Sequence, residues 1–344
     1  MKAIGFTETG PVDRSDALVE RELPDPIAAG HDLLVAVEAI SVNPVDTKIR
    51  GGTPLRHGTQ ATGNAFRVLG FDAVGTVKTV GSDVTLFRAG DRVFYAGSVQ
   101  RPGTNAELQL VDERIVGLAP KSLSSAEAAA LPLTAITAWE MLFDRLDVNR
   151  PVPRNNRTLL IVGGAGGVGS IATQIAKRVA GMRVIATASR PETIAWAKAM
   201  GADHVIDHTQ PLAAQAKALG LDAPGFVLST TQTAKHFADI LDLIAPQGRL
   251  GVISGIGDTT RADPLSGKSI TLCYELMFTR SNFQTADMVE QHRLLTEVSR
   301  LVDDGTLRTT MAQHLGKITA ENLLRAHALL ENGRAIGKVV LEGF

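Results

Sequence analysis

The chain has 344 residues, which is long enough for about two domains that each bury a core. Lysine and arginine total 35 and aspartate and glutamate total 36, so the net charge of -1 provides no overall field for nucleic acid or an anionic membrane. The single cysteine, Cys273, excludes an internal disulfide and a zinc cluster built from cysteines. Composition therefore favours small-molecule chemistry.

The first residues, MKAIGFTETG, lead directly into strand-like sequence and lack the basic and apolar regions of a signal peptide. No apolar run approaches the roughly 20 residues that span a bilayer. We therefore expect a soluble, cytoplasmic protein that acts on a small-molecule substrate and has neither nucleic acid nor a membrane as partner.

Short apolar or alternating runs fill the N-terminal third of the chain, separated by glycine, proline and aspartate turns. They predict strands over 32–40, 73–80, 92–95 and 106–111. This part of the chain is expected to be rich in β-structure.

The pattern changes at Ser124, which precedes a helical run through Ala130; Pro132 interrupts the run, and a helical pattern resumes over 134–146. From Thr158 strands alternate with helices. The strands are predicted at 158–162, 183–188, 204–206, 226–229 and 249–253, and the helices at 167–180, 191–200 and 234–244. Such alternation implies right-handed βαβ crossovers and a parallel sheet.

The remaining elements follow the parallel sheet. Residues 270–276 form an apolar run that suits an edge strand and, through that edge, a homodimer. Residues 286–304 predict a long helix, and 338–341 predict a final strand.

A glycine-rich turn stands between the strand at 158–162 and the next helix. Gly164, Gly166 and Gly169 have the spacing G-x-G-x-x-G. The glycines allow a tight turn, a close approach of the backbone to a pyrophosphate and close packing of helix on strand, while the helix N-terminus faces the anion. The motif predicts a dinucleotide site; a glycine-rich turn of an unrelated α/β fold is the alternative.

The residues at the end of the second strand of this sheet indicate whether NADPH or NADH is the expected cofactor. In NAD enzymes an acidic residue about 20 positions after the glycines binds the ribose 2′-hydroxyl. Here Ser189 and Arg190 follow the strand, and the first carboxylate is Glu192. A hydroxyl and a guanidinium suit a 2′-phosphate, so NADPH is the expected cofactor. The alternative is an Arg190 that only solvates the start of the next helix.

Several motifs together resemble the medium-chain dehydrogenase/reductase superfamily, particularly its quinone-oxidoreductase branch and the members called zinc-type alcohol dehydrogenase-like. They are SVNPVDTKIR (41–50), VLGFDAVG (68–75), AGDRV (89–93), AALPLT (129–134), TAWE (137–140), the glycine turn and GKVVL (337–341). The resemblance implies an α/β fold class with two domains. A GroES-like, β-rich catalytic domain would span 1–124 and 283–344, and a Rossmann domain with a doubly wound parallel sheet would span 125–282 and bind NADPH.

Zinc-dependent members of this superfamily bind their catalytic metal through three ligands. By resemblance, the ligand places fall at Asn43, at Phe71 and at Leu133 or Thr134. A phenyl ring cannot ligate zinc and an amide is a poor substitute for a thiolate or an imidazole, so we expect no metal. Without zinc, quinones and α,β-unsaturated carbonyl compounds are the acceptors that most easily take a hydride.

The resemblance also implies site residues. Asn43 would lie beside the nicotinamide ribose and the substrate, or else would bond only its own turn before Pro44. Asp46 has the same two interpretations. Lys48 stands where related reductases often carry a tyrosine that can donate a proton, and it is either a donor or an exposed lysine. Asp72 is expected to form structural hydrogen bonds.

We expect the cofactor to be bound by Thr134, Gly164, Ala165, Gly166, Gly167, Val168, Gly169, Ser189, Arg190, Ser254, Ile256, Phe278, Thr279 and Lys338. The expected function is NADPH-dependent reduction of a quinone or an enone without metal. A zinc-dependent alcohol dehydrogenase and a non-catalytic NADPH-binding structural or regulatory protein are the alternatives.

Overall fold

A computed structural model describes residues 1–53, 65–153, 156–257 and 263–344. The chain divides into two compact units. Unit 1 comprises Met1–Ile136 and Phe278–Phe344, and unit 2 comprises Thr137–Met277. The sequence places the two boundaries at 124/125 and 282/283. Among the described residues, no helix is both long and apolar enough to cross a membrane.

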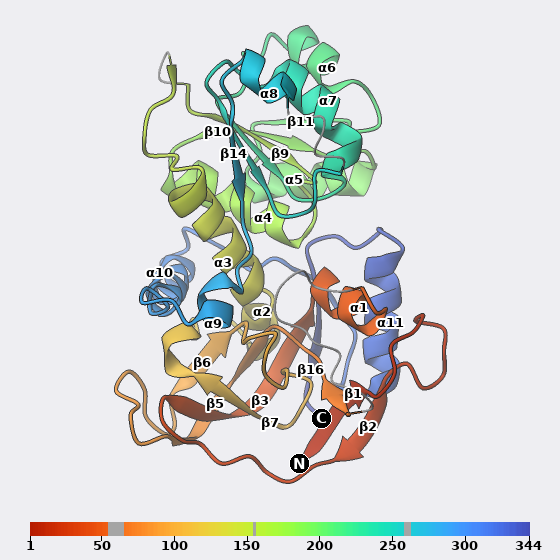
Figure 1. Ribbon diagram of the computed structural model, residues 1–344, viewed down its shortest axis with the longest axis vertical. Helices are drawn as coiled ribbons and strands as arrows, with labels where there is room; N and C mark the ends of the chain where they lie inside the picture. The colour runs from red at the N-terminus through yellow and green to blue at the C-terminus, as the bar shows by residue number, and fades with distance from the viewer. Residues whose placement is uncertain (54–64, 154–155, 258–262) are drawn as a thin grey trace. The chain divides into compact units, whose positions relative to one another are not determined.

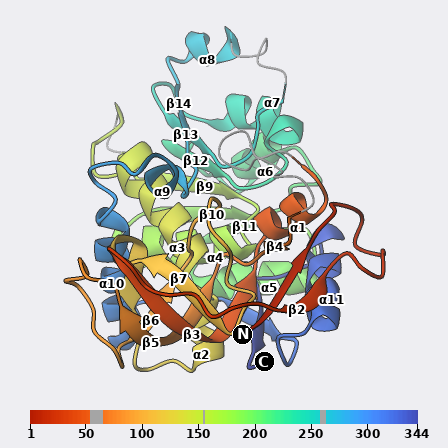
Figure 2. The ribbon, with the colours of Figure 1, turned by 60° about the horizontal axis from the view of Figure 1, so that its bottom comes forward.

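Unit 1 is rich in β-structure, as its sequence predicts, and its described strands pair antiparallel except for β15 and β16, which are parallel. Its main sheet has the order β15-β16-β3-β5-β6-β8, with β7 pairing to β3, and a smaller sheet has the order β2-β1-β4. The strands are β1 (Lys2–Phe6), β2 (Val19–Glu22), β3 (Asp32–Val42), β4 (Arg67–Val68), β5 (Ala73–Val80), β6 (Arg92–Tyr95), β7 (Leu108–Asp112), β8 (Val116–Leu118), β15 (Met311–His314) and β16 (Lys338–Glu342). Both ends of the chain lie in this unit and close together (Figures 1 and 2).

The helices of unit 1 cover the ends and edges of its main sheet. They are α1 (Pro44–Arg50), α2 (Ser125–Ala129), α9 (Thr279–Phe283), α10 (Glu290–Asp303) and α11 (Ala320–Glu331), and α3 (Pro132–Trp139) begins in this unit. Contacts place α10 against β8 and α11 against β16, so the two helices lie at opposite sides of the sheet (Figure 2). Ser124 caps α2 in a capping box with Glu127, which confirms the helix start predicted there.

Unit 2 confirms the predicted parallel sheet. The described strands have the order β11-β10-β9-β12-β13-β14, and all adjacent pairs are parallel. They are β9 (Thr158–Val162), β10 (Arg183–Thr187), β11 (His204–Ile206), β12 (Phe226–Ser229), β13 (Arg249–Val252) and β14 (Thr271–Tyr274). The run predicted as an edge strand is β14, at one end of this order. The homodimer predicted for that edge stays a prediction.

Helices of unit 2 pack on the parallel sheet, as βαβ units require. They are α4 (Gly167–Gln174), α5 (Pro191–Met200), α6 (Leu212–Ala218), α7 (Thr233–Leu243) and α8 (Asp263–Gly267). Residues of α6 and α7 share one apolar core with the strands, and α4 packs beside α5 (Figure 1). The sequence prediction for α5 has the same bounds as the structure.

Three helix predictions need correction. The helix predicted over 134–146 is α-helical only as far as Trp139, and Glu140–Arg145 form a π-helical turn. The helix predicted over 167–180 is α-helical only as far as Gln174, and Ile175–Val179 form a second π-helical turn. The helix predicted over 286–304 begins only at Glu290. It starts late because the backbone of 285–290 closes local turns and Asp287 accepts a hydrogen bond from Arg280 at 3.1 Å.

The sequence analysis missed α1 and α11, which are joined by a buried arginine. Arg50 at the end of α1 is 1% exposed, and its Nε donates to Nδ1 of His327 on α11 at 3.2 Å. A second guanidinium nitrogen pairs with Glu331. Burial lowers the pKa of His327 to about 3, so the imidazole stays neutral and accepts this bond. The C-terminal helix therefore fixes α1, which follows Asn43.

Two buried carboxyl groups lie side by side in unit 2. Glu140, on the first π-helical turn, is fully buried, and Glu275, directly after β14, is 5% exposed. The two side chains are hydrogen-bonded, and Arg145 Nε donates to Glu275 Oε2 at 2.7 Å. Burial raises the pKa of Glu275, Glu140 raises it further and Arg145 opposes the rise. The pair therefore retains a proton at pH values where an exposed carboxyl is ionised.

This proton predicts a pH dependence of stability. The pKa of Glu275 is raised in the folded protein from its ordinary value of 4.5, so above that pH the folded state binds more protons than the unfolded chain. The stability that this group contributes therefore falls as pH rises. Glu275→Gln stays neutral throughout, and its free energy of unfolding should improve relative to the wild type as pH rises from about 4.5.

Chemical denaturation of both proteins across a pH series measures this difference. Glu321→Gln, at an exposed position of α11, controls for the loss of one carboxylate. Parallel stability curves for Glu275→Gln and the wild type would show that Glu275 is ionised in the folded protein.

Candidate active site

The order of three strands in unit 1 brings Asn43, Asp72 and Lys338 together. In the main sheet β3 lies between β16 and β5. Val42 pairs with Val339 on one side, and Ile40 pairs with Ala73 on the other. Asn43 directly follows β3, Lys338 is the first residue of β16 and Asp72 directly precedes β5. All three therefore stand at the same end of adjacent strands, although they are far apart in the sequence.

Asp72 is the centre of the resulting buried network, which we call the Asp72 cluster: Ser41, Asn43, Asp72, Lys338 and the backbone N–H of Leu133. Asp72 Oδ2 accepts hydrogen bonds from Ser41 Oγ, Asn43 Nδ2 and Lys338 Nζ, each at 2.8 Å. Oδ1 accepts from the Leu133 N–H at 2.7 Å. Both members of the Asp72–Lys338 ion pair are buried, with side chains 0% and 3% exposed. The hydrogen-bonding role expected of Asp72 agrees with these contacts.

Asn43 connects this cluster to the start of α1. Its Oδ1 accepts a hydrogen bond from Lys338 Nζ, and its Nδ2 also donates to the Phe71 carbonyl at 3.2 Å. Its backbone N–H donates to Asp46 Oδ2 at 2.8 Å, in a capping box at the N-terminus of α1. Asn43 is 1% exposed and every contact holds its amide in one orientation. The contacts with Asp46 agree with the expectation that Asn43 bonds its own turn, and its place beside a nicotinamide and a substrate stays a prediction.

Asp46 is a second buried carboxyl next to the cluster. It accepts from the N–H groups of Asn43 and Gly70, the latter at 3.1 Å. Burial raises the pKa of Asp46 to about 7, while those N–H groups and the charge of Lys338 oppose the rise. Asp46 therefore changes its ionisation near neutral pH, beside a residue expected to contact the ligand.

The structure does not bring every predicted residue of unit 1 into this network. Lys48 is exposed on α1. Thr134 is buried and its hydroxyl donates to the Leu131 carbonyl at 3.1 Å. Phe278 packs edge-on against Phe71 with ring centroids 5.3 Å apart, and Thr279 begins α9 beside it. Thr134, Phe278 and Thr279 belong to unit 1, although the sequence boundaries place them in the cofactor domain.

In unit 2 the glycine turn has the geometry that its sequence predicts. Gly163 has a φ of +86°, a conformation that favours glycine, and Gly166 is the N-cap of α4. A Cβ on Gly169 would lie 2.2 Å from the Gly163 carbonyl oxygen, so α4 can approach β9 only without one. A Cβ on Gly166 would meet its nearest atom at 3.7 Å. The N–H groups that begin α4, including those of Gly167 and Val168, lack partners within the helix by geometry.

The end of β10 carries the two residues expected to select the cofactor. Ser189 and Arg190 are both half-buried, and Arg190 is the N-cap of α5. Arg190 Nε pairs with Glu192 Oε1 at 2.7 Å. Close by, Thr187 Oγ1 accepts from the Gly163 N–H at 3.0 Å and contacts His208 Nδ1 at 3.3 Å. A 2′-phosphate would therefore compete with Glu192 for the guanidinium.

Hydroxyl groups organise the ends of β12 and β13. Thr233 Oγ1 lies 2.9 Å from both Ser229 Oγ and Ser254 Oγ, and these hydrogen bonds hold Ser254 in place. Ile256 is 7% exposed and belongs to the apolar core, so the backbone from Ser254 to Ile256 is anchored at both ends. The sequence analysis did not assign Thr187, His208 or Thr233 to the site. Their positions in the sequence could have identified them, because each lies within a few residues of the carboxyl end of a predicted strand.

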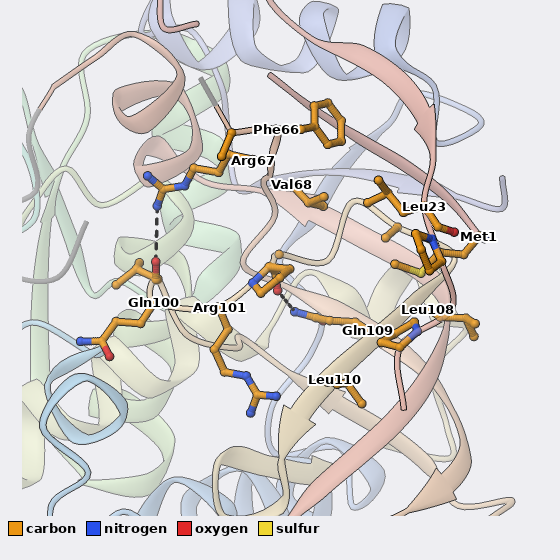
Figure 3. Close-up of a pocket in the computed structure, with 17 residues that line it drawn as sticks. Met1, Leu23, Phe66, Arg67, Val68, Gln100, Arg101, Leu108, Gln109 and Leu110 are labelled. Carbon is orange, nitrogen blue, oxygen red and sulfur yellow. Dashed lines mark hydrogen bonds between the residues drawn. The ribbon is translucent and has the colours of Figure 1, made fainter. Parts of the chain in front are cut away.

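A separate pocket of about 790 Å³ lies within unit 1 (Figure 3). Its lining is largely apolar, with Phe66, Val68 and Leu108 among the labelled side chains. Gln109 donates to the Pro102 carbonyl at 2.9 Å, and Arg67 donates to the Val99 carbonyl at 3.3 Å. None of the described residues that line the pocket belongs to the Asp72 cluster or to the residues predicted to act in catalysis or to bind the cofactor.

Comparisons with known proteins agree with both units. The family model described as Alcohol dehydrogenase GroES-like domain matches residues 29–131, and the model described as Zinc-binding dehydrogenase matches 167–298. A zinc-type alcohol dehydrogenase-like protein of Staphylococcus aureus (strain MSSA476) is 43% identical over 342 residues, 99% of each chain. A crystal structure from Rhizobium etli CFN 42, described as a zinc-dependent alcohol dehydrogenase protein, is 59% identical with a TM-score of 0.94, covering 100% of this chain and 98% of that one.

Less similar relatives have descriptions that state a specific activity or a bound cofactor. A 2-methylene-furan-3-one reductase of Solanum lycopersicum is 29% identical over 350 residues, which are 99% of this chain and 79% of that protein. A mycobacterial protein solved in complex with NADPH is 29% identical with a TM-score of 0.81, over 99% of this chain and 100% of that one.

Together the fold, the glycine turn and these likenesses define an oxidoreductase of two domains, GroES-like and Rossmann. The chain belongs to the medium-chain dehydrogenase/reductase superfamily, and its relatives there include zinc-type alcohol dehydrogenase-like proteins. The resemblance and the fold class predicted from the sequence are confirmed.

The family descriptions imply zinc, but the residues of this chain do not fit it. The expected ligand places hold an amide that is already bonded to Lys338, a phenyl ring, and either a leucine or a threonine. Zinc needs thiolate, imidazole or carboxylate ligands. Within the part of the chain that the structure describes, no group of three or more histidine, cysteine, aspartate or glutamate residues could hold a metal ion.

The glycine turn generates a paired prediction. Gly169→Ala places its Cβ 2.2 Å from a backbone oxygen and 2.8 Å from the Gly164 Cα, and should lower the free energy of unfolding by about 1 to 3 kcal/mol. Gly166→Ala meets nothing closer than 3.7 Å and should lower it by less than about 1 kcal/mol. Its Cβ occupies the approach of the pyrophosphate, so dinucleotide binding should weaken strongly.

Denaturation and titration with NADPH measure the two effects on the same proteins. Wild-type NADPH affinity in a folded Gly166→Ala variant would mean that the pyrophosphate does not approach this turn.

Proposed function

We propose that this protein is an NADPH-dependent oxidoreductase that transfers hydride to a quinone or an α,β-unsaturated carbonyl compound without a metal. The observation that carries the proposal is the glycine turn between β9 and α4, followed by Ser189 and Arg190 where NAD enzymes place an acid. The NADPH complex of a mycobacterial relative supports the same cofactor.

The residues of unit 2 fit a dinucleotide phosphate. The open N–H groups at the start of α4 and the space above Gly166 suit the pyrophosphate. Ser189 and Arg190 would bind the 2′-phosphate after Arg190 leaves Glu192. The anchored backbone at Ser254 and Ile256 would support the nicotinamide end. When it is bound, the nicotinamide supplies the hydride, which is the difficult part of the chemistry.

The residues of unit 1 would position the acceptor and stabilise its charge. Asn43 is held rigid by its contacts, which is what a residue that orients a ligand requires. Asp46 holds the backbone of that residue, and its pKa of about 7 makes it able to hold or release a proton. Lys48 is exposed on the same helix and is given no catalytic role in this proposal. Thr134, Phe278 and Thr279 are proposed as further cofactor contacts.

The acceptor class follows from the poor fit to zinc. An alcohol or a simple aldehyde needs an electrophile that polarises its oxygen strongly, and zinc supplies this in other dehydrogenases. In a quinone or an enone the added charge is delocalised into a carbonyl group, so hydrogen bonds can suffice. The tomato relative is named as a reductase of such a conjugated ketone.

Steady-state kinetics with a benzoquinone and with cyclohexenone, after exhaustive chelation, test the proposal. Turnover should persist without metal and should be faster with NADPH than with NADH, because one or two charge-assisted hydrogen bonds of about 1.5 to 3 kcal/mol each distinguish the cofactors. Activity that chelation abolishes and zinc restores would instead identify a zinc-dependent alcohol dehydrogenase. Tight NADPH binding without turnover on either acceptor would favour a structural or regulatory protein.

Two variants at one ion pair serve as controls for cofactor choice. Arg190→Ala should narrow the difference in affinity between NADPH and NADH. Glu192→Gln should preserve or widen it, because the variant releases the guanidinium from its partner at 2.7 Å. Equal affinity of the wild type for both cofactors would refute the proposed roles of Ser189 and Arg190.

A further inference from the structure

Lys338 is a buried cation with unused hydrogen-bonding capacity. Its side chain is 3% exposed, and Nζ donates to Asn43 Oδ1 and to Asp72 Oδ2. An ammonium group has three N–H donors. Among the described residues only these two acceptors meet it, so one donor is left over. A buried donor without a partner is unfavourable, and an oxygen atom from a ligand or water would satisfy it.

The ammonium also lies among the residues that stand at the metal-ligand places. Asn43 contacts Nζ directly, the Phe71 carbonyl accepts from the Asn43 amide at 3.2 Å, and the Leu133 N–H donates to Asp72. The carboxylate of Asp72 is fully buried, so the cluster requires a nearby positive charge. In this chain Lys338 supplies that charge from the C-terminal strand.

We propose that the Lys338 ammonium takes the place of the catalytic metal, and that its third N–H donates a hydrogen bond to the carbonyl oxygen of the acceptor. This rests on the proposed function. A fixed cation in a buried site stabilises negative charge that develops on an oxygen, as a metal would, and needs no reorganisation to do so. Asp72 and Asn43 hold the cation in place.

The chemistry of an enone balances without a proton from Lys338. The hydride, with its two electrons, would come from the NADPH of the proposed function, which is thereby oxidised to NADP⁺, and would form a bond to the β-carbon while the π electrons of the double bond move toward the carbonyl oxygen. The third N–H stabilises that oxygen but keeps its proton. A proton from water then reaches the α-carbon, which completes the saturated ketone.

Kinetics and NADPH titration test the donor. Lys338→Met alone leaves a buried carboxylate without its cation, so the informative variant is Lys338→Met combined with Asp72→Asn. In a folded double variant, turnover of cyclohexenone should fall by about 100-fold or more, as for the loss of one donor to a developing oxyanion, while the Kd for NADPH changes less than about threefold. Asp72→Asn alone measures how much of the loss of turnover comes from removing the carboxylate. Lys317→Met removes an exposed lysine near β16 and controls for the loss of a lysine outside the site.

A second measurement does not depend on turnover. In protein with isotope-labelled lysine, the NMR signal of the Lys338 ammonium should shift when cyclohexanone, the product, is added to the complex with NADP⁺. A shift with NADP⁺ alone, and none with the ketone, would assign the donor to the cofactor and overturn the proposal. Wild-type turnover in the double variant, or one bound zinc per wild-type chain, would overturn it as well. If the wild type has no turnover, the proposed function fails and the NMR signal still decides the role of Lys338.

Discussion

The buried carboxylate of Asp72 is the constraint on which the site of unit 1 depends. A fully buried charge is strongly unfavourable unless hydrogen bonds and an opposite charge compensate for it. Here the compensation comes from the end of β3, the start of α3 and the first residue of β16. Asp72 therefore ties the N-terminal strands to the C-terminal end of the chain. This explains why the two ends must form one domain before the site exists.

A different constraint governs unit 2, where close packing requires glycines, which have no side chain. Gly169 lets α4 lie against the turn after β9, and Gly164 would place a Cβ 2.6 Å from Ala186. The helix N-terminus is thereby held close to the end of the parallel sheet, where dinucleotides bind in such folds. Unit 2 thus offers backbone donors for phosphate, whereas unit 1 offers a rigid amide and a cation. The proposed reaction needs both, because the cofactor brings the hydride and the protein must hold the acceptor.

Local patterns predicted much of the fold but little of the network around Asp72. The strands at 158–162 and 226–229 and the helix at 191–200 agree in their bounds with the structure, because apolar runs and a proline at the first helical position are local signals. The π-helical turns were not predictable from periodicity, since they keep a helical apolar pattern. The contact between Lys338 and Asp72 spans 266 positions and follows only from the strand order β16-β3-β5. The pairing of Arg190 with Glu192, by contrast, was open to sequence reasoning because the two are near neighbours on one helix start.

A double-mutant cycle on the free energy of unfolding tests most directly whether the Asp72–Lys338 pair organises the site. The measurement compares the wild type, Asp72→Asn, Lys338→Met and the double variant by chemical denaturation. Lys338→Met alone should destabilise the protein by about 3 to 5 kcal/mol, because it leaves a buried carboxylate without its cation. The double variant should be destabilised by clearly less than the sum of the two single variants. Effects that add to within about 0.5 kcal/mol would contradict the account, since they would mean that the two side chains do not stabilise each other.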